Sequence, residues 1–125
     1  MILDTSALSA WAEEDASFLR FLPPAASVDL PVIVVGEYRF GIRRSRARSR
    51  LDPWLDGLVR EHRVLDVNLE SAEIYATLRE RLRELGRPIP DNDLWIAALA
   101  VQHEAPILSR DSHFDAVAGV TRIEW

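Results

Sequence analysis

The chain begins Met1-Ile2-Leu3-Asp4-Thr5-Ser6-Ala7-Leu8, and this stretch indicates how the fold is built. The apolar run at the start predicts a short strand, which Asp4 ends. Thr5 or Ser6 can then cap a helix that continues through Trp11. The chain is therefore predicted to open as strand, carboxylate and helix.

Short apolar runs alternate with helical patterns along the rest of the chain. Further strands are predicted at residues 26–30, 64–67, 106–109 and 120–124. Helices are predicted at residues 17–22, 51–61, 69–85 and 91–103, with a helical turn at 112–117. Strands that alternate with helices predict an α/β fold, in which a parallel sheet is covered on both faces.

The helix after Asn68 has the clearest pattern. Asn68 is a good helix cap, and Gly86 suits the helix end. Six apolar residues are spaced along one side, which is expected to face the core: Leu69, Ala72, Tyr75, Leu78, Leu82 and Leu85.

The segment after Pro31 is ambiguous. Val32-Ile33-Val34-Val35 favours a strand by propensity, but Val32, Val35 and Ile42 also fit one face of a helix whose first turn Pro31 would suit. The prolines of the chain, Pro53 included, are expected at element boundaries.

Composition limits the possible functions. The 125 residues suit one domain, and the absence of cysteine excludes disulfide frameworks, zinc–thiolate sites and cysteine nucleophiles. All 15 basic residues are arginine and 20 residues are acidic, so the net charge of −5 argues against coating nucleic acid by bulk charge. With no signal peptide and no apolar run long enough to span a membrane, a cytoplasmic protein is expected.

Several carboxylates stand where a parallel sheet places its ligands, beyond the carboxyl ends of strands. Asp4 follows the first strand and Asp111 follows the fourth, so the two acids would meet if these strands are neighbours. Asp91 and Asp93 lie in the first turn of a helix. Glu37 lies in an apolar stretch, where a buried carboxylate needs a partner.

Carboxylates that converge without a lysine or histidine cluster repel one another, and a divalent cation would relieve this repulsion. Hard oxygen ligands favour Mg²⁺ or Mn²⁺ over zinc. Such a site can polarise a phosphodiester and activate water. The three histidines, His62, His103 and His113, are expected to be surface or packing residues.

Each acid also has a structural interpretation. Asp4 and Asp91 could cap their helices, Asp111 could be a turn residue, and Asp115 is expected to be a solvated residue of a helical turn.

Four motifs occur in order along the chain. They are Met1-Ile2-Leu3-Asp4-Thr5-Ser6-Ala7-Leu8, Val35-Gly36-Glu37-Tyr38-Arg39-Phe40-Gly41-Ile42, Asn92-Asp93-Leu94-Trp95-Ile96-Ala97-Ala98 and Leu108-Ser109-Arg110-Asp111-Ser112-His113-Phe114. Together they resemble the PIN-domain family, and within it the VapC-like toxins of bacterial toxin–antitoxin pairs. The resemblance covers residues 1–125 as a single PIN domain. It implies a three-layer sandwich with a central, mostly parallel five-stranded sheet flanked by helices, and a helix over residues 32–44.

The resemblance also implies a function and a site. A member is expected to be a Mg²⁺-dependent (or Mn²⁺-dependent) endoribonuclease that cleaves RNA, pairs with a cognate antitoxin and forms a homodimer. The catalytic acids carry over onto Asp4, Glu37, Asp93 and Asp111, with Asp4 and Asp93 as metal ligands. The auxiliary residues are the hydroxyls of Thr5, Ser6 and Ser109, with Asp91 and Asp115 as second candidates beside Asp93 and Asp111.

An arginine run follows the Glu37 motif without an intervening acid. It consists of Arg39, Arg43, Arg44, Arg46, Arg48 and Arg50. The run could guide an RNA backbone towards the metal or dock an acidic antitoxin segment. Its other interpretation is a solvated helix face and loop.

Three rival functions fit the sequence less well. A phosphoacceptor receiver domain needs a lysine, which this chain lacks. A haloacid-dehalogenase-like phosphatase needs a second acid two residues after the first, where Ser6 stands. A non-catalytic PIN-like binding or scaffold module remains the main alternative, and the presence of all four acids speaks against it.

Overall fold

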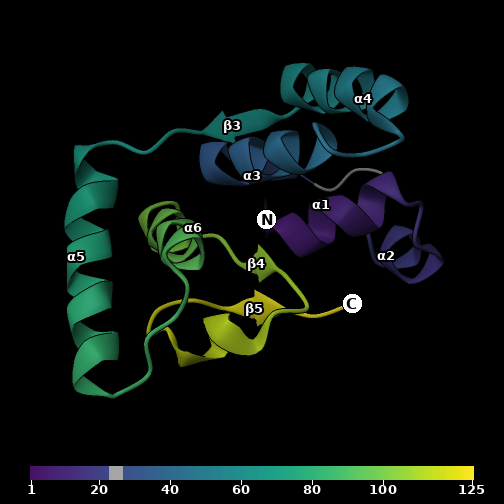
Figure 1. Cartoon of the computed structure of the whole chain (residues 1–125). Helices are drawn as coiled ribbons and strands as arrows, with labels where there is room; N and C mark the ends of the chain where they lie inside the picture. The colour runs from purple at the N-terminus through teal and green to yellow at the C-terminus, as the bar shows by residue number, and fades with distance from the viewer. Residues whose placement is uncertain (23–26) are drawn as a thin grey trace.

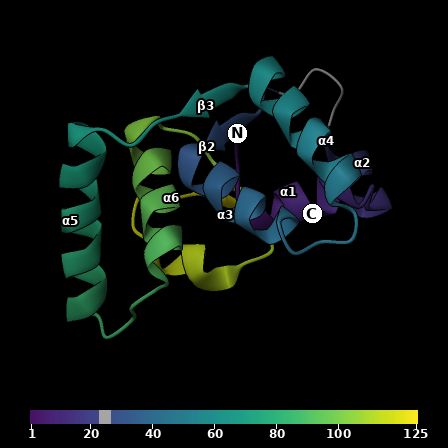
Figure 2. The same cartoon turned by 45° about the horizontal axis from the view of Figure 1, so that its top comes forward.

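The computed structural model describes residues 1–22 and 27–125 (Figures 1 and 2). Its strands are β1 (Ile2–Leu3), β2 (Asp29–Pro31), β3 (Arg63–Leu65), β4 (Ile107–Leu108) and β5 (Arg122–Ile123). Its helices are α1 (Thr5–Ala12), α2 (Ala16–Phe21), α3 (Val32–Ile42), α4 (Arg48–Glu61), α5 (Leu69–Glu84), α6 (Asp91–Gln102) and the 3₁₀ helix η1 (Ser112–Ala116). The predicted α/β class and the alternation of strands and helices are confirmed.

The five strands form one parallel sheet in the order β3-β2-β1-β4-β5. The central strand β1 pairs with β2 on one side and with β4 on the other, where Ile2 lies opposite Ile107 and Leu3 opposite Leu108. The strand order therefore reverses beside β1. In such sheets, ligands bind at this point beyond the carboxyl ends of the strands.

The helices pack around this sheet. In both views α5 is the outermost helix, and α6 lies between it and the remainder of the molecule (Figures 1 and 2). The buried face of α6 includes Ala97, Ala98 and Ala100, whose small side chains permit close packing. The core also takes in β1 and β4, whose four residues are fully buried.

The ambiguous segment after Pro31 is divided between two elements. Pro31 is the last residue of β2, and α3 begins at the next residue and ends at Ile42, two residues before the predicted end. Pro31 precedes the first turn in extended conformation and provides no side-chain cap. The helix prediction for residues 32–44 is thus confirmed in its type and start.

The prediction for β2 started too early. The strand was expected at residues 26–30 and spans Asp29–Pro31, and the expected position Ala26 lies outside the described residues. Asp29 is buried in the strand because the fork of Arg63 on β3 donates to both of its carboxylate oxygens, each at 2.9 Å. A paired acid can therefore occupy a buried position in a strand.

The caps predicted for α5 are confirmed, but part of its predicted apolar face is wrong. Asn68 and Ser71 form a reciprocal capping box, and Gly86 has a φ of +64°, which suits glycine after a helix end. Leu78 and Leu82 are buried, whereas Leu69 and Leu85 are 80% and 67% exposed. These two leucines lie at the ends of the helix, beyond the surface on which its middle packs.

Pro53 also departs from expectation, because it lies inside α4. The helix starts three residues before the predicted Leu51, which puts Pro53 in its second turn. Pro53 and Ser49 are exposed, so water can bond to the carbonyl that proline leaves without an N–H donor. Within the described ranges, none of the helices combines the length and apolar character that a membrane span requires.

Candidate functional site

Asp4 lies at the carboxyl end of β1, and its side chain is almost fully buried. Its Oδ1 accepts a hydrogen bond from the backbone N–H of Ala7 at 2.8 Å, which caps α1. The hydroxyl of Ser6 donates to the same carboxylate at 2.8 Å, and the hydroxyl of Ser109 donates to Oδ2. Burial raises the pKa of Asp4, an effect that these hydrogen bonds partly offset. Asp4 is therefore both a helix cap and a site residue.

Ser109 joins the ends of the two neighbouring strands. It is fully buried, and its hydroxyl accepts a hydrogen bond from the backbone N–H of Asp111 at 2.8 Å while donating to Asp4. The juxtaposition of Asp4 and Asp111 expected from neighbouring strands is thus present, and the charge of Asp111 contributes to the raised pKa of Asp4. Asp111 also caps η1 by accepting from the N–H of His113 at 2.9 Å.

Asp93, Asp111 and His113 form the centre of the site. Nδ1 of His113 lies 3.1 Å from Oδ2 of Asp93 and 3.0 Å from Oδ1 of Asp111. One donor atom from each of these residues lies within 4.8 Å of the others. Burial raises the pKa of Asp93, and the charges of Asp111 and Glu37 add to this effect while His113 opposes it. His113 is exposed, as expected of a surface residue, and it also lies between two carboxylates, a position that the sequence did not predict.

Glu37 reaches the same region from α3. Its Oε2 accepts from the hydroxyl of Thr5 and its Oε1 from the side-chain amide of Asn92, both at 2.7 Å. These two donors are the partners that a carboxylate in an apolar stretch requires. No site role was predicted for Asn92, although its place directly before Asp93 at a helix start was a usable signal.

Asp91 and Asp115 are held away from the cluster. Asp91 accepts from the hydroxyl of Tyr75 and lies 3.6 Å from Arg79, both on α5, and it does not cap its helix. Asp115 accepts from the two guanidinium nitrogens of Arg122 at 2.7 and 2.9 Å, which lowers its pKa. Asp115 is exposed in the turn of η1, as expected, and the sequence did not predict its pairing with Arg122 of the edge strand β5.

The arginine run is only partly available for a ligand. Arg39 lies 3.0 Å from Asp52 and 2.5 Å from Asp56, and Arg48 pairs with Asp52 at 3.1 Å. Arg50 donates to the carbonyl of Ala12. Arg43, Arg44 and Arg46 are exposed and form no ion pair within the described parts of the chain, although Arg44 lies over the ring of Phe40.

The donor set suits a divalent cation. Asp93, Asp111 and His113 offer two carboxylate oxygens and one imidazole nitrogen from one region, and the buried carboxylate of Asp4 lies beside them. Asp4, expected as a ligand, is not among the three residues whose donor atoms lie within 4.8 Å of one another. Burial is the main cause of the raised pKa values of Asp4 and Asp93, and the neighbouring carboxylates add to it, so a cation bound here would favour the ionised forms.

Comparisons with known proteins show which family the chain resembles. The sequence profile of the PIN domain matches residues 1–120. Ribonuclease VapC5 of Mycobacterium tuberculosis is 32% identical, and the match covers 98% of this chain and 91% of that protein. The VapC ribonuclease Y4jK of Sinorhizobium fredii is also 32% identical, with 96% of this chain and 93% of that protein covered.

Two solved structures show how far the fold is shared. FitAcB from Neisseria gonorrhoeae has a TM-score of 0.81 and 29% identity, and the match covers 98% of this chain and 95% of that one. VapBC2 from Rickettsia felis, bound to a DNA fragment from its promoter, has a TM-score of 0.86 over 99% of this chain and 97% of that one. Its identity of 22% makes it evidence for the fold alone.

Proposed function

The chain belongs to the PIN domain family, and from that membership we propose that it is an endoribonuclease of the VapC type, the toxin of a toxin–antitoxin pair. The observation that carries this proposal is the gathering of Asp93, Asp111 and His113 beside Asp4 at the reversal point of the sheet. An RNA substrate and a protein antitoxin make the cytoplasm the expected compartment.

The site favours Mg²⁺ or Mn²⁺ as the cofactor. We expect Asp93 and Asp111 to hold the ion together with Asp4, whose carboxylate Ser109 and Ser6 orient. When bound, the ion would polarise the phosphodiester and activate the attacking water. Nδ1 of His113 lies between the carboxylates of Asp93 and Asp111, at the edge of this ligand set.

Glu37 has a separate role in this proposal. The donors Thr5 and Asn92 fix both of its oxygens, and each oxygen keeps a further lone pair for a ligand. We expect this carboxylate to orient the attacking water or to accept its proton. Because Glu37 and Asp93 lie on different helices, the relative position of α3 and α6 sets the geometry of the reaction.

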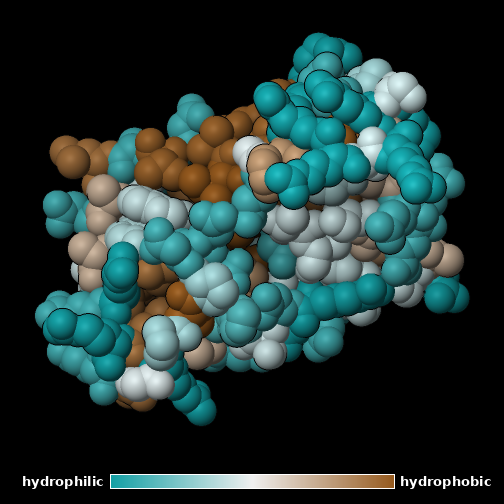
Figure 3. All heavy atoms as spheres, viewed as in Figure 1, coloured by the Kyte–Doolittle hydropathy of each residue, from teal (hydrophilic) through white to brown (hydrophobic). Residues whose placement is uncertain are grey.

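The proposed partners are an RNA substrate, an antitoxin and a second copy of the chain. Arg43, Arg44 and Arg46 are the members of the run best placed to bind an RNA backbone or an acidic antitoxin segment, because Arg39 and Arg48 are already paired within the chain. For the homodimer, Figure 3 shows apolar surface at the upper left, above the starts of α3 and α5, where Val32 and Leu69 are exposed. Light scattering of the purified protein tests the dimer.

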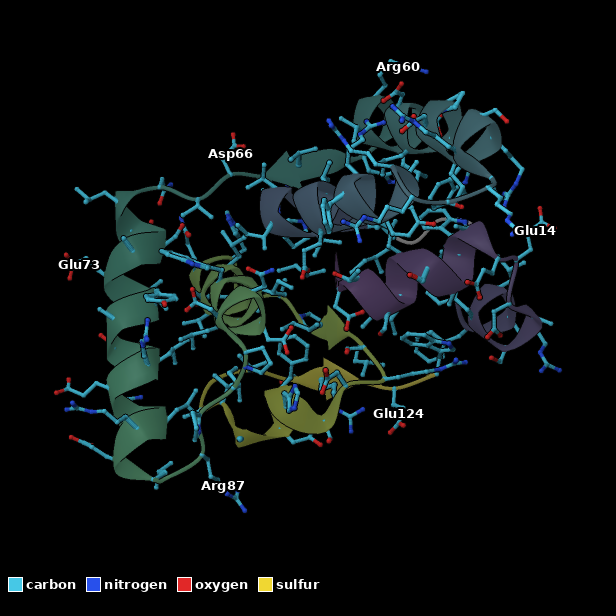
Figure 4. The ribbon with its side chains drawn as sticks, viewed as in Figure 1. Glu14, Arg60, Asp66, Glu73, Arg87 and Glu124 are labelled. Atoms are coloured by element: carbon cyan, nitrogen blue, oxygen red, sulfur yellow. The ribbon has the colours of Figure 1, made fainter. Side chains whose placement is uncertain are left out.

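The proposed activity is tested by incubating a structured RNA with the purified protein in Mg²⁺ and in EDTA. We expect cleavage in Mg²⁺ and none in EDTA. The matched variants are Asp93→Asn, which should cleave about a hundredfold or more slowly, and Asp66→Asn, which removes the same charge from a side chain that points away from the body of the molecule (Figure 4). A protein that binds an antitoxin but cleaves no RNA in either condition would be the non-catalytic module instead.

A further inference from the structure

Two hollows meet over the connector between α5 and α6. The first, about 610 Å³, has an apolar floor of Leu82, Ile89 and Leu94, with Arg79 and Arg83 of α5 along its wall. Figure 3 shows apolar surface between charged side chains in the region that Figure 1 places between α5 and α6. The second, about 430 Å³, is lined by Arg87 and by His113.

The two hollows adjoin at the connector, and the path along them leads towards the carboxylate cluster. Pro88 and Ile89 of the connector line both of them. At the far end of the path, His113 contacts both Asp93 and Asp111. We call this path the connector groove: it runs from Arg79 and Arg83 over Pro88 and Ile89 to Arg87 and His113.

The charges of the connector groove favour an anionic ligand. Its two acids are paired within the chain, Asp91 with Tyr75 and Arg79, and Asp115 with Arg122. Arg83 and Arg87 are exposed, and neither forms an ion pair in residues 1–22 and 27–125. Figure 4 shows Arg87 extending into solvent at the foot of the connector. Two exposed guanidinium groups without an ion-pair partner therefore border a groove whose own lining acids, Asp91 and Asp115, are paired.

The groove combines two features that suit a single nucleic-acid strand. Free arginines can bind phosphates, and an apolar floor can accept the face of a base. An acidic peptide could bind the arginines, but its carboxylate side chains would make fewer contacts with the apolar floor of Leu82, Ile89 and Leu94.

An enzyme that cuts within a strand must hold that strand on both sides of the cleaved bond. Glu37 and the arginine run lie on α3 and the segment after it, while the connector groove approaches from His113 and α5. We propose that the connector groove binds the RNA strand on one side of the cleaved bond, with Arg83 and Arg87 binding its phosphates. This inference rests on the proposed ribonuclease function.

The test compares two double variants of equal charge. Arg83→Gln/Arg87→Gln removes the free arginines of the groove, and Arg20→Gln/Arg60→Gln removes two exposed arginines from α2 and α4. Binding of a fluorescent single-stranded RNA is measured in EDTA over a range of salt concentrations, and steady-state cleavage is measured in Mg²⁺. We expect the groove variant to bind at least tenfold more weakly, to raise KM with kcat near wild type, and to reduce the log–log salt slope by about 0.7 for each phosphate that it no longer binds.

A third variant separates charge from structure. Arg83→Lys/Arg87→Lys keeps both charges and should keep most of the RNA affinity, whereas a purely structural role would not be rescued in this way. The proposal is overturned if the groove variant binds RNA like the α2/α4 control, or if it loses affinity for a polyglutamate peptide while RNA binding is intact. If the proposed function is wrong, the wild type shows no metal-dependent cleavage. RNA binding in EDTA is measured without cleavage, so the two failures can be told apart.

Discussion

At the scale of single residues, the start of α6 directs three consecutive side chains to three neighbours. Successive side chains on a helix are about 100° apart, so Asp91 reaches Tyr75 on α5, Asn92 reaches Glu37 on α3, and Asp93 reaches His113 on η1. Only the last of these acids joins the carboxylate cluster. Asp93 therefore belongs to the site, whereas Asp91, only two residues earlier, links α6 to α5.

The two acids are expected to respond differently to the same substitution. Asp93→Asn should lower the rate of RNA cleavage by about a hundredfold or more, as removal of a group that organises a charged site usually does. Asp91→Asn should lose far less, because its carboxylate contacts Tyr75 and Arg79. Single-turnover cleavage rates check both values, and the reverse order would show that Asp91 serves the metal.

The raised pKa of Asp4 gives a prediction about stability without metal. A carboxyl whose pKa is higher in the folded than in the unfolded state destabilises the folded protein when it is ionised, and this cost disappears as the pH falls towards 3.8. Asp4→Asn should therefore raise the melting temperature in EDTA at neutral pH, since the amide oxygen can still cap α1.

The advantage of Asp4→Asn should shrink as the pH falls towards 3.8, and melting curves over this range check it. Asp15 does not mimic this effect. The hydroxyl and amide of Ser17 lower the pKa of Asp15 to about 2, so its stabilising contribution is lost only as the pH falls from 3.8 towards 2. A lower melting temperature for Asp4→Asn at neutral pH would show that the carboxylate is needed for the fold itself.

At the scale of helices and strands, local signals predicted the element types better than the contacts between elements. The caps of α5 are local, so Asn68 and Gly86 marked its ends correctly. Val32-Ile33-Val34-Val35 carried two conflicting local signals, and the family resemblance was needed to choose the helix. Leu69 and Leu85 follow the helical spacing, but only the packing of α5 on α6 determines that they extend beyond the core.

The candidate site was predictable to a similar extent. Asp4 and Asp111 were expected to meet because both follow strands, and the pairing of β1 with β4 brings them together. The role of His113 depends on the turn of η1, and that of Asn92 on the distance between α3 and α6. Neither arrangement can be read from spacing along the chain.

The arginine run gives a prediction at the level of one segment. Arg43→Ala, Arg44→Ala and Arg46→Ala combined should weaken RNA binding and reduce its salt slope by about 0.7 for each phosphate that the variant no longer binds. Turnover at saturating RNA should stay near the wild-type value, because these residues contribute uniform binding. The salt dependence of binding checks this.

Binding of an acidic antitoxin peptide, measured beside RNA binding, distinguishes the two uses proposed for the run. Arg39 is expected to act on stability instead: Arg39→Ala should lower the melting temperature, because Arg39 links α3 to Asp52 and Asp56 of α4. If the triple variant binds RNA with an unchanged slope but no longer binds an acidic antitoxin peptide, the run serves inhibition alone. If both interactions are unchanged, the run is a solvated surface.

At the scale of the whole molecule, the carboxylate cluster links metal binding to stability. A cation that binds only the folded protein stabilises it by about 2.7 kcal/mol at a concentration one hundred times its Kd. We therefore expect millimolar Mg²⁺ or Mn²⁺ to raise the melting temperature relative to EDTA. Asp93→Asn should reduce this shift and Asp66→Asn should preserve it; equal melting temperatures with and without metal would argue against a preformed site.

The stabilisation by metal is expected because the site residues come from several helices and strands that only folding brings together. Asp4 follows β1, Glu37 lies on α3, Asp93 starts α6, and Asp111 and His113 belong to the turn after β4. The unfolded chain therefore cannot offer the same ligand set, and the ion should bind to the folded state alone.

The central claim is that these carboxylates cleave RNA with the help of a divalent ion. The most direct test is the single-turnover cleavage rate of one RNA as a function of Mg²⁺ concentration, for the wild type, Asp93→Asn and Asp66→Asn. We predict a rate that rises with Mg²⁺ and saturates for the wild type and Asp66→Asn, with a loss of about a hundredfold or more for Asp93→Asn. Cleavage at the full rate in EDTA, or an Asp93→Asn protein as active as the wild type, would contradict the claim.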